Sequence, residues 1–277
     1  MVDYRNNAGF GGTRARDLYE SSVMTMTDDE LLHYARQLLL SDVDVDGQQK
    51  LKKSHVVVLG LGGLGSPVAL YLAAAGVGRL TLVDGDRVDP TNLHRQIIHS
   101  RDYLGCLKVE SAHQRIAGLN PFIQVDTVPE YANFKNMSFL DESVDCIADC
   151  TDRFSTRFMA NRMALDTGTP LVSAAALGIE GQITTIDPRD SNAPCYACLI
   201  PDIPEVERTC AENGVLGPVV GMIGTLQAVE VIGILLGWPD RLTGRLLRFH
   251  AKQMSWKSFF YRKDPSCVEC GSAREFI

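Results

Sequence analysis

The chain contains 277 residues, enough for one large α/β domain or two small ones. Its content of 45% hydrophobic and 22% charged residues is ordinary for a soluble globular protein. The formal net charge of −7 argues against nucleic acid as the main partner, because a nucleic-acid-binding surface is usually basic.

The first 26 residues are polar, contain glycine and lack an apolar core of signal-peptide length. We expect residues 1–26 to form a mobile tail and the protein to be cytoplasmic. Thr27 and Glu30 then form a capping box at the start of a helix. Because no clear linker follows, we expect a single domain over residues 27–272 and a C-terminal tail at 273–277.

A strand, a glycine-rich turn and a helix follow one another in residues 56–78. Residues 56–59 are aliphatic, as in a buried strand, and Pro67 suits the first turn of the helix. The turn GLGGLG fits the pattern G-x-G-x-x-G at Gly60, Gly62 and Gly65. Such a turn can hold a phosphate at the helix N-terminus and is typical of NAD-dependent dehydrogenases. A doubly wound fold without a nucleotide also places glycines here, so the turn alone does not identify a ligand.

Strands and helices alternate through the following residues. Strands are predicted at 80–86, 122–129 and 143–152, helices at 108–118 and 157–168, and two strands around a glycine turn at 169–186. This alternation predicts a Rossmann-like, doubly wound α/β fold with a mainly parallel sheet and helices on both faces.

Residues 217–237 form a long apolar segment that needs a membrane test. Gln227 and Glu230 interrupt it, which favours a buried helix over a transmembrane span and argues against a membrane partner. Pro218 suits the first turn of this helix, and Gly237 suits its end.

Polar residues after the second strand bear on the choice of nucleotide. Asp84 follows the glycine turn by about 20 residues, the spacing of a carboxylate that accepts hydrogen bonds from a ribose of NAD or ATP. Asn92, Arg95, Gln96 and Lys108 come next, and such side chains suit a chain of phosphates. A nicotinamide enzyme does not need them there, although any single one could be a solvated loop residue.

Asp152 lies in CTDR, at the end of the fourth strand, where open α/β sheets bind ligands. It suits Mg²⁺, which bridges phosphates and needs only one or two carboxylates. The alternative is a helix N-cap for the helix that follows, and the two roles are compatible.

Two C-x-x-C pairs stand far apart in the sequence, namely Cys195 with Cys198 and Cys267 with Cys270. Two such pairs supply the four thiolates of a structural Zn²⁺ site, which would fasten the C-terminal part to the domain. A redox pair lacks its usual βαβ context, and a disulfide scaffold is unexpected in a chain of this size. Cys210, in a polar loop near Arg208, is either a reactive thiol or an inert one.

In order, GLGGLG, DGD, TNLHRQ, Lys108 and CTD closely resemble the MoeB/ThiF/HesA family, the bacterial relatives of ubiquitin-activating enzymes. The resemblance covers about residues 27–272. It implies a fold that binds ATP and Mg²⁺ and adenylates the C-terminal Gly-Gly of a small ubiquitin-like sulfur carrier, with release of pyrophosphate. The predicted nucleotide-binding residues are Gly60, Gly62, Gly63, Gly65, Asp84, Asp86, Thr91, Asn92, Leu93, His94, Arg95, Gln96, Lys108, Asp152 and Arg153.

The resemblance also implies roles in catalysis. Arg95 and Lys108 would offset charge on the phosphates, and Asp152 would hold the magnesium. HYARQ matches the family segment whose arginine reaches the partner subunit's ATP, which implies that Arg36 acts in trans in a homodimer. Cys210 stands where some members form a thioester or persulfide with the carrier. The family usually has TDN, so Arg153 leaves the contact at that position open.

The resemblance leaves the carrier open between ThiS-like proteins of thiamine biosynthesis and MoaD-like proteins of molybdenum cofactor biosynthesis. VERTCAENGVLGPVVG resembles ThiF, whereas GIEGQIT resembles MoeB. The chain shows no rhodanese-type domain, so we expect a separate sulfur donor protein. The alternatives are an NAD-dependent Rossmann oxidoreductase, a zinc-stabilised binding module, and an adenylating enzyme acting on another peptide or on tRNA.

Overall fold

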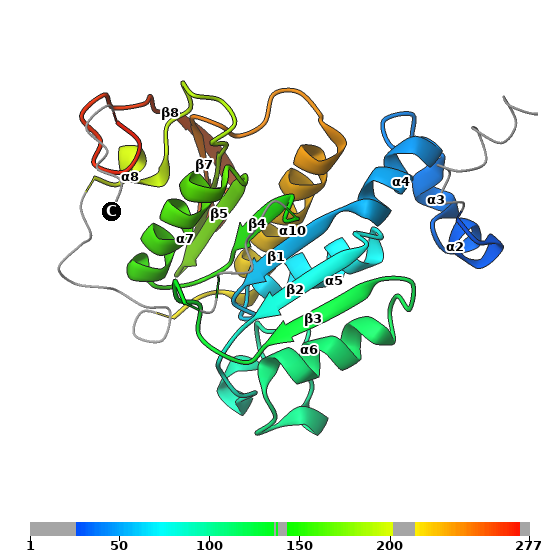
Figure 1. The fold of residues 1–277 in the computed structure, drawn as a ribbon. Coiled ribbons are helices and arrows are strands. Elements are labelled where there is room, and N and C mark those ends of the chain that lie inside the picture. Colours follow the sequence, from blue (N-terminus) through cyan, green and yellow to red (C-terminus); the bar gives the residue numbers. More distant parts are fainter. Residues whose placement is uncertain (1–25, 136, 138–142, 202–213, 272–277) are drawn as a thin grey trace, which may run out of the picture.

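The computed structural model describes residues 26–135, 137, 143–201 and 214–271 (Figure 1). Its centre is an eight-stranded sheet in the order β3-β2-β1-β4-β5-β6-β7-β8. Of the predicted tails at 1–26 and 273–277, all residues except Met26 lie outside the described residues, and so does Cys210. Met26 is buried.

The sheet is parallel from β3 to β5 and antiparallel from β5 to β8. In chain order its strands are β1 His55–Leu59, β2 Arg79–Val83, β3 Gln124–Val128, β4 Cys146–Asp149, β5 Leu171–Leu177, β6 Glu180–Ile186, β7 Arg245–His250 and β8 Ser255–Phe260. The chain moves outward from β1 to β3 and then returns to β4 on the other side of β1. This reversal between β1 and β4 confirms the predicted doubly wound fold.

Helices cover both faces of the sheet. One core contains residues of α5 Gly65–Ala74, α6 Lys108–Ala117 and α10 Gly217–Leu236, and the other contains residues of α7 Phe154–Thr167 and α8 Tyr196–Leu199. Along β1, Val56 and Val58 belong to the first core, whereas Val57 and Leu59 belong to the second. A strand with both faces buried needs an unbroken aliphatic sequence, which explains why this segment does not alternate with polar residues.

Shorter elements complete the described chain. They are α2 Asp28–His33, α3 Ala35–Leu38, α4 Asp44–Lys53 and the 3-10 helices η1 Pro90–Asn92, η2 Arg101–Tyr103 and η3 Ala251–Gln253. Thr27 and Glu30 form the predicted capping box at the start of α2. The helices α2, α3 and α4 lie near the end of the sheet where β1 begins (Figure 1).

α10 is buried in the fold, as predicted. Among the described residues it is the one helix long and apolar enough to cross a bilayer, yet 61% of that apolar window is buried inside the protein. Gln227 Nε2 donates to the carbonyl oxygens of Asp149 and Val172, both at 2.9 Å. Glu230 Oε1 accepts from Thr185 Oγ1 at 2.8 Å. The polar residues of α10 therefore bind neighbouring strands, as buried polar groups must.

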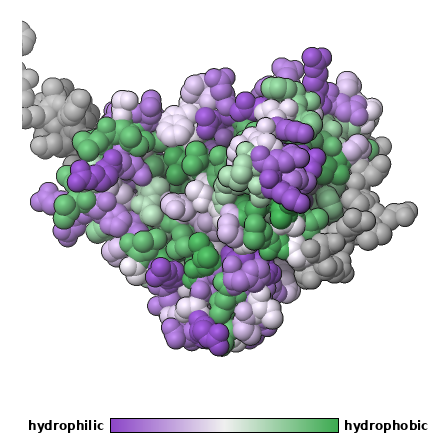
Figure 2. All heavy atoms as spheres, turned by 180° about the vertical axis from the view of Figure 1, so that it is seen from behind, coloured by the Kyte–Doolittle hydropathy of each residue, from purple (hydrophilic) through white to green (hydrophobic). Residues whose placement is uncertain are grey.

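Glycines let α10 lie close to α5. A Cβ at Gly224 would come within 2.5 Å of both the Leu64 carbonyl oxygen and Pro67 Cγ. A Cβ at Gly221, one turn earlier, would meet nothing within 4 Å. Figure 2 views the molecule from behind, where broad hydrophobic areas lie between charged side chains. Tyr71 of α5 and Val229 of α10 are among the exposed large apolar residues.

This packing predicts opposite effects for two alanine substitutions on one helix. Gly224→Ala should lower the free energy of unfolding by about 2 kcal/mol or more, because backbone and proline atoms must move. Gly221→Ala should raise it by about 0.5 kcal/mol, because alanine is the better helix former. Urea unfolding followed by circular dichroism measures both. Equal effects of the two substitutions would contradict the close approach at Gly224.

Candidate functional site

A cavity of about 490 Å³ opens at the carboxyl ends of β1, β2 and β4, where the strand order reverses. This is the position at which open α/β sheets bind ligands. Most of the predicted nucleotide-binding residues line it, namely Gly60, Gly62, Gly63, Asp84, Asp86, Asn92, Arg95, Gln96, Lys108, Asp152 and Arg153. The sequence motifs therefore come together in one place although they are spread over about a hundred positions.

The remaining predicted residues do not line this cavity. Gly65 starts α5, and a Cβ there would lie 1.9 Å from the Gly60 carbonyl oxygen, so its role is to close the turn. Leu93 ends η1, while Thr91 and His94 contact Arg95. Arg36 is exposed on α3, near the opposite end of the sheet (Figure 1).

The glycine turn is shaped by its own backbone and by α10. Gly60 has φ +85°, a conformation that L side chains rarely adopt. At Gly63 a Cβ would lie 2.5 Å from Val220 Cγ1. Gly63, the glycine of GLGGLG that lies outside the G-x-G-x-x-G pattern, is thus explained by the approach of α10.

Asp84 ties the glycine turn to the next loop. Its Oδ2 accepts from the Leu61 N–H at 2.7 Å, and its Oδ1 accepts from the Asp86 N–H at 2.8 Å. Burial raises the pKa of Asp84, an effect that Lys108 and these N–H donors oppose. Each oxygen keeps a second lone pair, so the contacts are compatible with the predicted acceptance of ribose hydrogen bonds.

Lys108 begins α6, and its side chain is only 5% exposed. Its Nζ lies 2.8 Å from Asp86 Oδ2, and the Tyr131 hydroxyl donates to the other oxygen of Asp86. Partial burial alone would raise the pKa of Asp86, but the hydrogen bonds from Lys108 and Tyr131 lower it. The Lys108–Asp86 ion pair therefore lies at the wall of the cavity.

Arg95 is held by three neighbours. Its Nη2 donates to Asn92 Oδ1 at 2.7 Å, and its Nη1 lies 2.8 Å from His94 Nε2 and 3.3 Å from the Thr91 carbonyl oxygen. Gln96 follows it, 4% exposed, and its Oε1 has no hydrogen-bond partner among the described residues. The segment TNLHRQ thus orients one arginine toward the cavity and buries one amide beside it.

Asp152 and Arg153 are exposed at the cavity. The alternative prediction that Asp152 caps the next helix is wrong. α7 starts at Phe154, earlier than predicted, and its N-cap is Arg153, whose side chain makes no capping hydrogen bond. The chain is still extended at Arg153, with φ −105° and ψ 133°, so Asp152 lies one residue too early to cap the helix.

Sequence reasoning missed several residues at the site. Tyr131, Thr151 and Arg157 line the cavity, and His99 lies behind the glycine turn. Tyr131 follows β3, and Arg157 lies in the first turn of α7, the helix that follows β4. Because ligands bind at the carboxyl ends of the strands, this closeness to strand ends could have indicated both residues. His99 joins two elements: its Nε2 is 3.0 Å from the Leu61 carbonyl oxygen and its Nδ1 is 3.0 Å from Ser111 Oγ.

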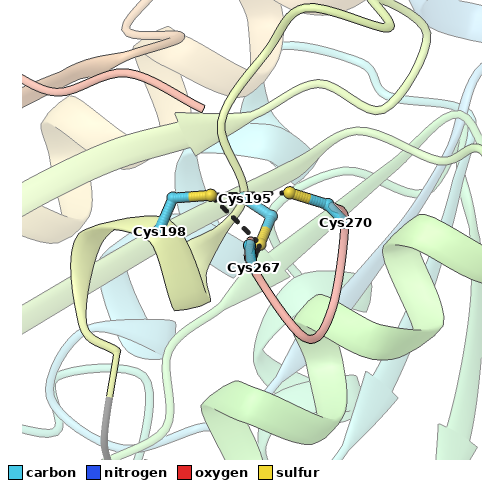
Figure 3. Close-up of side chains that lie close together, drawn as sticks. All are labelled: Cys195, Cys198, Cys267 and Cys270. Atoms are coloured by element: carbon cyan, nitrogen blue, oxygen red, sulfur yellow. Dashed lines mark hydrogen bonds between the residues drawn. The ribbon is translucent and has the colours of Figure 1, made fainter. Parts of the chain in front are cut away.

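The four paired cysteines form a second cluster, at the junction of α8 and the segment after β8 (Figure 3). The sulfur atoms face one another and all lie within 4.8 Å. Cys195 Sγ is 3.9 Å from Cys198 Sγ and 3.7 Å from Cys267 Sγ, and Cys198 Sγ is 3.4 Å from Cys270 Sγ. A tetrahedral zinc–thiolate site has sulfur atoms about 3.8 Å apart. The cluster is therefore compatible with a closed four-thiolate metal site.

Comparison with known proteins identifies the family. The ThiF family profile matches residues 34–269, which is most of the chain. This chain belongs to the ThiF family. The Sulfur carrier protein ThiS adenylyltransferase of Escherichia coli (strain K12) is 42% identical over 248 residues, covering 90% of this chain and 98% of that protein.

Longer relatives in the comparison carry a second activity in their names. The Adenylyltransferase and sulfurtransferase MOCS3 of Anopheles gambiae is 40% identical over 264 residues, covering 94% of this chain. This chain spans 59% of the length of that protein. Among solved structures, Escherichia coli MccB with AMPCPP and MccA gives a TM-score of 0.75 at 22% identity, over 90% of this chain and 76% of MccB. That likeness shows that the two proteins share a fold.

The buried position of His99 predicts a pH effect. Burial lowers the pKa of His99 to about 4 from its ordinary 6.5, so the unfolded chain takes up a proton that the folded chain refuses in this interval. Its contribution to stability is complete above pH 6.5 and is lost as the pH falls toward 4. The gap in unfolding free energy between the wild type and His99→Gln should shrink by about 2 kcal/mol between about pH 7 and pH 5. Urea titrations at both pH values measure this gap, and a constant gap would contradict the prediction.

Proposed function

We propose that this chain uses ATP to adenylate the C-terminal Gly-Gly carboxylate of a small ubiquitin-like sulfur carrier, releasing pyrophosphate. The observation that carries the proposal is the single cavity in which Arg95, Lys108 and Asp152 surround the glycine turn. The 42% identity to the ThiS adenylyltransferase, over nearly that protein's whole length, supports it.

In this mechanism the carrier's carboxylate attacks the α-phosphorus of ATP. No general base is needed, because a carboxylate is already ionised at neutral pH. Catalysis rests on positioning and on charge stabilisation. Arg95 and Lys108 offset the charge on the phosphates, Asn92 orients the phosphate chain, and Arg36 of a second copy adds a further cation.

Magnesium fits the exposed carboxylate of Asp152 at the cavity. It would neutralise the charge of the phosphates, as divalent ions do in phosphoryl-transfer sites. The role of Asp152 is to hold this ion at the edge of the cavity. An NAD-dependent oxidoreductase is the weaker proposal, because it gives Asn92, Arg95 and Lys108 no task.

The protein's partners follow from the same proposal. They are a ThiS-like or MoaD-like carrier, in the thiamine or molybdenum cofactor branch, and a separate sulfur donor protein, all in the cytoplasm. A homodimer would bring Arg36 to the neighbouring cavity, and the exposed apolar side chains of Tyr71 and Val229 are compatible with one. Cys210, outside the described residues, would serve as the thiol for a thioester or persulfide.

A structural zinc at the cysteine cluster completes the proposal. Four sulfur ligands leave no open position for chemistry, so the ion would join α8 to the C-terminal segment. Arg162 of α7 supports this junction, since its Nη1 lies 3.2 Å from Glu269 Oε2 in the second cysteine pair.

The test of the function is direct. The purified protein is incubated with ATP and either a ThiS-like or a MoaD-like carrier, and the mass of the carrier is measured. A carrier adenylate with one or both proteins is expected. The absence of adenylate with every carrier, together with nicotinamide binding, would overturn the proposal.

Replacing Arg95 should separate activity from folding. Arg95→Ala should reduce carrier-dependent pyrophosphate exchange by about a hundredfold or more, because a charged hydrogen-bond donor to the phosphates is lost. The exposed Arg101 of η2 does not line the cavity, so Arg101→Ala should keep wild-type exchange. Circular dichroism checks that both variants fold. Retained exchange in Arg95→Ala would exclude its assigned role.

Metal analysis tests the cysteine cluster. The purified protein should contain one zinc per chain, and Cys198→Ser should reduce it strongly, while Cys106→Ser, outside the cluster, should not. Removal of the metal by a strong chelator should lower the melting temperature by about 5 °C or more, because the ion binds only the folded arrangement. A metal-free protein with an unchanged melting temperature would contradict the structural role.

A further inference from the structure

Arg157 is a cavity residue to which the proposed mechanism gives no task. It lies in the first turn of α7 and is only 7% exposed. Its Nη2 donates to the carbonyl oxygen of Thr151 at 2.7 Å, and Thr151 directly precedes Asp152. A charged hydrogen bond from a buried guanidinium to a backbone carbonyl stabilises the conformation of the loop that carries this carbonyl.

The other side of the same loop is held by Asp149. Thr151 donates to Asp149 Oδ1 through both its N–H, at 3.1 Å, and its hydroxyl, at 2.6 Å. Ser173 Oγ donates to the second carboxylate oxygen at 2.7 Å. Burial alone would lower the pKa of Arg157, but Asp149, Tyr196 and Asp152 together raise it. Two opposite buried charges thus hold Thr151 between them.

Behind Arg157 lies Tyr196, which stands between the first pair of clustered cysteines. Tyr196 is 2% exposed, its N–H donates to Asn161 Oδ1 at 2.8 Å, and its ring meets that of Phe158 edge-on at 5.4 Å. Burial raises the pKa of Tyr196, whereas the nearby Arg157 lowers it. Three buried atoms here have no hydrogen-bond partner among the described residues, namely Arg157 Nε, Asn161 Nδ2 and the Tyr196 hydroxyl oxygen.

We propose that Arg157 is a positioning residue that fixes the Thr151–Asp152 loop for the nucleotide and its magnesium. The inference rests on the proposed function, because it assigns Asp152 to the magnesium. Since Arg157 acts through the loop, its loss should weaken the magnesium-dependent part of nucleotide binding.

The test measures equilibrium binding of a non-hydrolysable ATP analogue at increasing Mg²⁺ concentration. Arg157→Met should raise the Mg²⁺ concentration for half-maximal binding by about tenfold, because a charged hydrogen bond to the loop is lost. Arg157→Lys keeps a cation that can reach Thr151 and should restore most of the affinity. Arg157→Gln keeps a polar side chain without the charge and should shift the midpoint in the same direction as Arg157→Met.

Arg162→Met is the matched control. Arg162 lies on the same helix and pairs with Asp166 and with Glu269 of the second cysteine pair, but it does not line the cavity. It should leave the Mg²⁺ midpoint unchanged. If the wild type binds no ATP analogue, the proposed function itself fails. If the wild type binds and both Arg157→Met and Arg157→Gln keep its Mg²⁺ midpoint, only the positioning role is overturned. Should Arg157→Met not fold, the Arg157→Gln midpoint decides alone.

Discussion

The carboxylate of Asp84 is the contact on which the arrangement of the cavity depends. It lies just beyond β2 and accepts one backbone N–H from the glycine turn after β1 and one from the loop after β2. Parallel neighbours send both loops out at the same edge of the sheet, and a single buried carboxylate joins them there. Burial raises the pKa of Asp84, and Lys108 and the two N–H donors oppose this rise. The two hydrogen bonds that Asp84 accepts thus also fix the glycine turn relative to the loop after β2.

α10 supplies the rigid support behind these loops. Gly224 lets it touch Leu64 at the start of α5, and its Val220 fills the space that the missing side chain of Gly63 leaves. One turn after Gly224, Gln227 binds the carbonyl of Asp149, at the end of β4. One helix therefore contacts both loops that flank the switch point of the sheet. Its apolar, glycine-containing sequence, which resembles a membrane span in composition, follows from packing against other elements over much of its length.

Elements with a strong local signal were predictable from the sequence. The unbroken aliphatic run of β1, the capping box at Thr27 and the glycine at the end of α10 each express a local physical rule. The hairpin of β7 and β8 was not predicted, because its exposed strand β8 mixes apolar and polar residues without a clean alternation. The sequence pattern placed Asp84 and Lys108 near the glycine turn, but it did not show that Asp84 accepts from the Leu61 N–H or that Lys108 pairs with Asp86.

The residues of the site that no sequence motif indicated are placed there by tertiary contacts. The sequence around Arg157 does not indicate its hydrogen bond to Thr151. The helix was predicted to start at residue 157, whereas α7 starts at Phe154, so that Arg157 lies within its first turn. His99 likewise lies 38 positions from Leu61, whose carbonyl oxygen its Nε2 contacts. Its Nδ1 contacts Ser111 of α6, so both contacts depend on how the fold places α6 beside the glycine turn. Residues that bind a ligand can appear as motifs, whereas residues that hold those motifs in place depend on the whole fold.

The glycine turn itself does not distinguish NAD from ATP, because both nucleotides present a phosphate to a helix N-terminus. The distribution of positive charge does. Lys108 is almost fully buried, and an unpaired ammonium group in that position would be costly, so Asp86 balances its charge. Arg95 is likewise oriented in advance by Asn92 and His94. Fixing two cations at one edge of the sheet is unfavourable in desolvation and side-chain entropy. The favourable interaction with a polyanion such as a triphosphate offsets these terms on binding. A triphosphate carries more negative charge than the pyrophosphate of NAD, so these two side chains, rather than the glycines, support the proposal that the nucleotide is ATP.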